Sequence, residues 1–211
     1  MNRASEETRA RLNRFFLYAG CMLTILLLML IYEYTDYTLS HSAIFYRVLG
    51  LAMPPVLVGI ARASGYRWAA TKVAGIYFVV WLLALWLVPL EFPLVLFAGA
   101  AALDFLLDRF GEHNKWLQAT VGGGGFVLVM MAVQWPLGNF LVSRLAENRI
   151  FGTGYYPYMQ RPSDYHYSHE FYHWERTRLQ FWFGMAFALA AAILTTRVGL
   201  AWGDWMRRVR R

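Results

Sequence analysis

The chain has 211 residues, of which 58% are hydrophobic and only 16% are charged, and this composition excludes an ordinary soluble domain. The net charge of +7 is carried mainly by the two tails and by short loops, so we expect no nucleic-acid partner. The single cysteine, Cys21, excludes an internal disulfide and a cysteine metal cluster. The composition therefore predicts an integral membrane protein with a lipid membrane as its surroundings.

Apolar runs that could cross the ~30 Å hydrocarbon layer as helices recur along the chain. We predict an all-α protein, a bundle of about six transmembrane helices in a single domain, residues 1–211. A basic tail, residues 1–14, precedes the first run, and no small-residue cleavage site follows that run. The predicted spans are residues 15–32, 44–61, 69–90, 92–107, 116–135 and 181–202.

Lysine and arginine are concentrated in the N-terminal tail, in the loops after the second and fourth spans, and at the C-terminus. The positive-inside rule then predicts that both termini lie inside the cell. Residues 136–178 become a long outer-side segment before the last helix. The expected location is the cytoplasmic membrane of a prokaryote, either the inner or an intracellular membrane.

Acidic residues follow the first span and interrupt the fourth. Glu33 and Asp36 lie in a predicted outer loop, where they form either part of a polar site or a solvated surface. Asp104 lies within a span, where an ionised group costs about 2.5–3.5 kcal/mol on insertion scales and is by default a functional hypothesis. The alternative, which we favour, is a structural role near the end of the span, paired with Arg109 or Lys115.

Three of the five histidines lie in the outer segment, in SDYHYSHEFYHWERTR at residues 163–178. If these residues form a helix, His166, His169 and His173 fall within about 60° of one another, and Glu170 lies beside them. Imidazole with carboxylate suits copper, zinc or iron, so the four side chains are a candidate metal site. The alternative is an interfacial helix whose histidines bind lipids or loops, because this spacing has no single metal-site meaning.

Four glycines, Gly122–Gly125, lie in the fifth predicted span. They lack the lysine and hydroxyl residue that complete a phosphate-binding loop. Because small residues let helices approach closely in lipid, we predict that this run packs against a neighbouring helix.

The chain resembles one known family in three consecutive motifs: GAAALD at 99–104, NKWLQATVGGGGF at 114–126 and QWPLGNF at 134–140. These motifs look like the A subunit of the copper membrane monooxygenases, the family of particulate methane, ammonia and hydrocarbon monooxygenases. Two further segments, YEYTDYT at 32–38 and YYPYMQRP at 155–162, are similar to the family's layout.

The resemblance implies a subunit of a hetero-oligomeric complex with two other subunit types, B-like and C-like. Such a complex hydroxylates ammonia, methane or a short hydrocarbon with O2 and a reductant, for which quinol is the expected donor. The resemblance also implies that partner subunits hold the copper and that this chain is mainly scaffold and substrate surroundings. Two alternatives stay open: a non-catalytic membrane assembly subunit, and a self-sufficient histidine-based metal-binding membrane protein.

Overall fold

The computed structural model describes the backbone of residues 3–38, 41–84, 91–148 and 174–209, and side chains over 6–30, 51–80, 82–83, 93–133 and 186–209. Every regular element in these residues is an α-helix, which confirms the all-α prediction for the part of the chain described. The helices are α1 (Arg3–Thr38), α2 (His41–Ser64), α3 (Ala69–Ala84), α4 (Glu91–Arg109), α5 (Lys115–Asn148) and α7 (Trp174–Val209).

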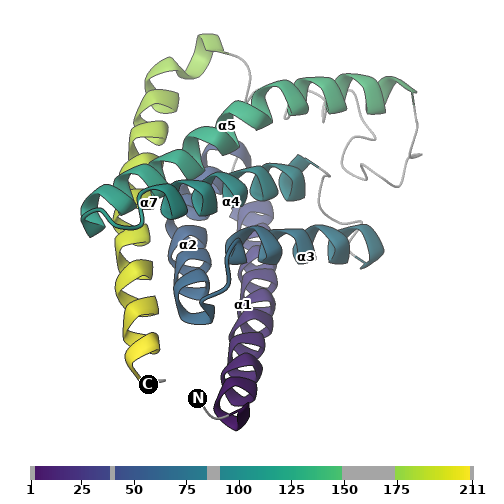
Figure 1. Cartoon of the computed structure of the whole chain (residues 1–211). Helices are drawn as coiled ribbons and strands as arrows, with labels where there is room; N and C mark the ends of the chain where they lie inside the picture. Colours follow the sequence, from purple (N-terminus) through teal and green to yellow (C-terminus); the bar gives the residue numbers. More distant parts are fainter. Residues whose placement is uncertain (1–2, 39–40, 85–90, 149–173, 210–211) are drawn as a thin grey trace.

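The helices are arranged in two directions. In Figure 1, α1, α2 and α7 run upright, whereas α3, α4 and α5 run across them. The upright set is held by packing of α2 against α7 and α1, and the crossing set by packing of α4 against α5 and α3. The two sets join where α5 meets α7 and where α3 meets α1 and α2. Both chain ends lie at the lower end of this view.

Within the described part of the chain, three helices are long and apolar enough to cross a membrane: Glu6–Leu30, Lys115–Val133 and Ala186–Val209. They overlap the predicted spans 15–32, 116–135 and 181–202, so the prediction of a membrane protein is supported. Two shorter apolar helices, Leu51–Ser64 and Ala69–Val80, lie in the second and third predicted spans. The described residues therefore support three spanning helices and do not confirm the predicted bundle of about six.

Three helices, α1, α5 and α7, extend well beyond the predicted spans. The basic N-terminal residues belong to α1 from Arg3 onwards, where Glu7 and Arg11 form an ion pair of 2.9 Å across one helical turn. Helix α5 continues past Pro136 to Asn148, although proline removes one N–H from the helical ladder. Helix α7 begins at Trp174, so both ends of the predicted segment 136–178 are helical.

Small residues bring the helices close together, as the glycine run predicts. A methyl group at Gly123 would lie 2.4 Å from the carbonyl oxygen of Ala192 in α7, and one at Gly199 would lie 2.7 Å from that of Pro55 in α2. Real Cβ atoms essentially never approach so closely, so only glycine permits these backbone contacts. The prediction that this run packs against a neighbouring helix is confirmed at Gly123.

Candidate functional site

The structure describes the predicted site residues to different extents: some lie outside the described residues, some have only their backbone described, and one has a described side chain. The candidate metal ligands His166, His169, His173 and Glu170 lie outside the described residues, within 149–173. Glu33 and Asp36 belong to the last turns of α1, not to a loop, and their side chains are outside the described set. Asp104 is the one predicted site residue whose side-chain contacts the structure describes.

The carboxylate of Asp104 caps the start of α3. Its Oδ2 accepts hydrogen bonds from the backbone N–H of Thr71 at 2.7 Å and from the Thr71 hydroxyl at 2.8 Å. Thr71 lies in the first turn of α3, where N–H groups have no partner within the helix and where negative charge is favourable. Asp104 is 8% exposed, so this carboxylate is a buried cap supplied by a different helix, α4.

The local sequence explains why α3 needs this cap from elsewhere. The residue before the helix is Trp68, which has no side-chain acceptor and adopts a left-handed backbone conformation with φ of 59°. Gly65, which follows α2, adopts the same region with φ of 65°, where glycine is favoured. The tight turn between α2 and α3 therefore places the first N–H groups of α3 against Asp104.

The partners predicted for Asp104 were wrong. Lys115 instead forms an ion pair with Asp204 of α7. Arg109 is exposed at the end of α4 and has no ion pair among the described residues. The physical reason is that Thr71, at the start of α3, places two donors beside the Asp104 carboxylate. Arg109 and Lys115 instead lie at the end of α4 and the start of α5.

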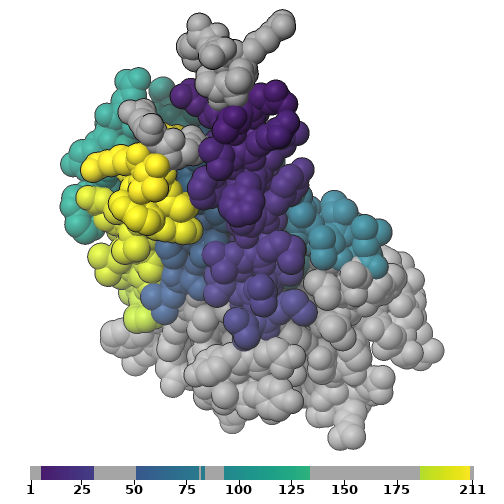
Figure 2. Space-filling model, turned by 90° about the horizontal axis from the view of Figure 1, so that it is seen from below, coloured from purple at the N-terminus to yellow at the C-terminus, as the bar shows by residue number. Residues whose placement is uncertain are grey.

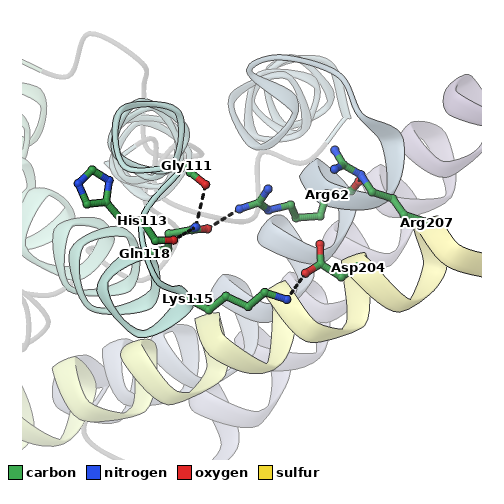
Figure 3. A network of polar contacts seen from close by, with 7 residues as sticks. All are labelled: Arg62, Gly111, His113, Lys115, Gln118, Asp204 and Arg207. Carbon is green, nitrogen blue, oxygen red and sulfur yellow. Dashed lines mark hydrogen bonds and ion pairs between the residues drawn. The ribbon is translucent and has the colours of Figure 1, made fainter.

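A second set of polar contacts, which we call the polar network, joins α2, α5 and α7 (Figure 3). The Arg62 guanidinium donates to Oε1 of Gln118, and the Nε of Arg207 donates to the carbonyl of Arg62. Lys115 donates to Oδ2 of Asp204. The polar network therefore consists of Arg62, Lys115, Gln118, Asp204 and Arg207.

Gln118 also holds the turn between α4 and α5. Its Nε2 donates to the carbonyls of Gly111 at 2.9 Å and His113 at 2.7 Å (Figure 3). Asn114 caps α5, because its Oδ1 accepts from the N–H of Trp116 at 2.7 Å and of Leu117 at 3.1 Å. Gln118 is only 4% exposed, and all its polar atoms have partners.

The chemistry available to these groups is structural. Asp104 and Asp204, the carboxylates with described side chains that are not exposed, are each engaged by donors of another helix. Among the residues with described side chains, no three His, Cys, Asp or Glu residues come together as a metal site. The predicted histidine donors lie outside the residues that this statement covers.

Sequence reasoning did not identify the polar network. Arg62, Gln118 and Asp204 each lie in or beside an apolar run, which is the one available signal, because polar groups there need partners. Their pairing depends on how α2, α5 and α7 approach, and a single sequence does not encode that approach in any local pattern.

No family model, curated protein or solved structure matches this chain.

Proposed function

We propose that this chain is the membrane scaffold subunit of a copper-dependent membrane monooxygenase, a complex that hydroxylates ammonia, methane or a short-chain hydrocarbon. The proposal rests on the motifs at 99–104, 114–126 and 134–140, which resemble the A subunit of that family. The three apolar helices that could cross a membrane are compatible with it.

One observation carries the scaffold part of the proposal: the motif residues with described side chains form helix contacts. A Cβ at Gly99 would meet Met130 at 2.5 Å, so α4 and α5 pack closely there. Asp104 caps α3, and Gln118 ties α5 to α2. Gly123 lets α5 approach the backbone of α7. The residues that carry the resemblance thus hold α3, α4, α5 and α7 together.

The proposed reaction suits a helical membrane scaffold. Hydroxylation of a strong C–H or N–H bond requires a site from which bulk water is excluded, and O2 and small apolar substrates partition into the bilayer. Copper on partner subunits would supply the oxidant, and quinol the electrons. The contribution of this chain is apolar helix surface around the site, such as the exposed α1 side chains Phe15, Met22, Leu26 and Leu30.

The proposed topology places both termini inside and residues 136–178 outside. His166, His169, His173 and Glu170 would then lie on the outer side, either binding a peripheral metal or lying against the copper-bearing helix of a B-like or C-like partner. Glu33 and Asp36 would lie on the same side and contribute to the surroundings of the site.

The test combines metal analysis with product analysis on the complex purified from membranes. We expect copper in the native complex and a hydroxylated product from at least one of ammonia, methane and butane. Simultaneous substitution of His166, His169 and His173 by alanine asks whether this chain contributes to copper binding. The matched control is His113→Ala, because that imidazole is exposed and only its backbone carbonyl takes part in the contacts of Gln118.

The outcomes separate the three functions. Copper and activity that survive the triple substitution place the metal on the partners and this chain in the scaffold. Loss of copper with the complex intact, and with His113→Ala unchanged, assigns ligands to this chain. A complex that contains no copper and forms no hydroxylated product would overturn the proposal and would favour the alternative of a non-catalytic assembly subunit.

A further inference from the structure

Arg197 lies in the apolar part of α7, two turns before Asp204, within the stretch Ala186–Val209 that could cross a membrane. A charged side chain within such a helix is costly and marks a site whose partner should be named. In the described residues 186–209, Asp204 is the only acid, and Lys115 already engages it.

The contacts of Arg197 with the described residues leave its Nε without a hydrogen-bond acceptor. Its guanidinium carbon lies over the ring of Trp116, 5.7 Å from the ring centroid, a cation–π contact. Its Nε is shielded from solvent and has no hydrogen-bond partner, and the side chain forms no ion pair with any residue the structure describes. The guanidinium is thus oriented by an aromatic face, and its terminal Nη groups, rather than the shielded Nε, are the donors that an external anion would reach.

Trp116 indicates the depth of this pair in the membrane. It is the second residue of α5, at the beginning of the stretch Lys115–Val133 that could cross a membrane. Tryptophan rings favour the headgroup level of the bilayer, and long arginine side chains extend towards that level. The ring is 54% exposed, so it faces outwards. Trp116 begins the predicted span 116–135 and Arg197 lies in the last third of the predicted span 181–202, so in the predicted topology both lie towards the same membrane face.

An apolar stripe on α7 continues from this pair towards the middle of the helix. Phe187, Leu194 and Val198 are exposed and recur at helical spacing, and Arg197 lies within about 60° of Leu194 around the helix axis. In Figure 2, the end of α7 (yellow) adjoins a green-teal region on the same side of the molecule, and α5 packs against α7. A cationic group at headgroup level beside an apolar stripe matches the shape of a phospholipid.

We propose that Arg197 and Trp116 form a phospholipid-binding site between the start of α5 and α7. The guanidinium binds the lipid phosphate, for which its planar set of donors is suited, and an acyl chain lies along Leu194 and Phe187. Because the guanidinium adds a positive charge at the phosphate, the site favours a lipid with net negative charge over a zwitterionic one. The site goes beyond the proposed function and does not depend on copper.

The test measures the phospholipid retained by the full-length protein, purified with its native partners. The complex is delipidated in detergent, incubated with equal amounts of phosphatidylglycerol and phosphatidylcholine of the same acyl composition, and analysed by native mass spectrometry. Wild type should retain phosphatidylglycerol preferentially. Arg197→Gln should weaken that retention about tenfold, as expected when a charge-assisted contact is lost.

The matched control is Arg208→Gln, an exposed arginine on the same helix whose retention should stay within about twofold of wild type. Trp116→Leu removes the aromatic face and should also weaken retention, which provides a second variant if Arg197→Gln does not fold. Excess inorganic phosphate should not displace the lipid, because the acyl contacts are part of the site. Wild-type retention in both Arg197→Gln and Trp116→Leu, equal losses in Arg197→Gln and Arg208→Gln, or displacement by free phosphate would overturn the proposal.

Discussion

At the scale of single residues, Asp104 shows how an acid within an apolar helix can be explained by its backbone surroundings. Its two hydrogen bonds to Thr71 replace the cap that Trp68 cannot provide. We expect Asp104→Ala to lower the free energy of unfolding by about 1–2 kcal/mol, the range for loss of a helix cap. Asp104→Asn should cost less, because its amide oxygen can still accept both bonds. Thermal unfolding of the purified protein in detergent measures the difference.

The control for this prediction is Asp108→Asn, one turn further along α4. Asp108 forms a 2.9 Å ion pair with Arg67, but both side chains are largely exposed, so its loss should cost at most about 1 kcal/mol. If Asp104→Ala were no more destabilising than Asp108→Asn, the capping role would be wrong. The sequence singled out Asp104 through its position in an apolar run, but its partner depends on the turn between α2 and α3, which no periodicity reveals.

At the scale of helices, the glycine run contains one position where an alanine side chain would clash, Gly123, and one where it would fit, Gly124. We expect Gly123→Ala to destabilise the protein by about 1–3 kcal/mol, because the added methyl would meet the backbone of Ala192, which has no freedom to move aside. Gly124→Ala is the matched control, because a Cβ at Gly124 meets no atom within 4 Å. Alanine should there be neutral or stabilising, since it favours helix over glycine. Equal unfolding temperatures for the two variants would contradict the packing of α5 on α7.

The helices themselves were the most predictable feature. Each predicted span lies on a helix over the residues described, because a long apolar run in a membrane protein has to satisfy its backbone groups internally. The ends of α5 were less predictable. The predicted span ended at residue 135, yet α5 continues past Pro136 to Asn148, since one missing N–H does not prevent a helix from continuing. The crossing of α3, α4 and α5 over α1, α2 and α7 had no signal in the sequence at all.

At the scale of the whole molecule, Gln118 joins three parts of the chain: α2, α5 and the turn before α5. We expect Gln118→Leu to lower stability by about 1–3 kcal/mol, because it leaves the Arg62 guanidinium and two carbonyls without their partner. Gln118→Glu should retain the bond from Arg62 and lose only the two bonds that the amide donates. Thermal unfolding of both variants in detergent distinguishes these contributions, and a Gln118→Leu protein as stable as wild type would show that the polar network does not hold the helices together.

The central claim concerns the assembly to which the whole molecule belongs. The most direct measurement is purification of this chain from its native membrane through an affinity tag, with identification of co-purified proteins and determination of copper in the same sample. The account predicts two further integral membrane subunits in a constant ratio to this chain, together with bound copper. Recovery of this chain without membrane partners and without copper, from membranes gently solubilised in several detergents, would contradict it.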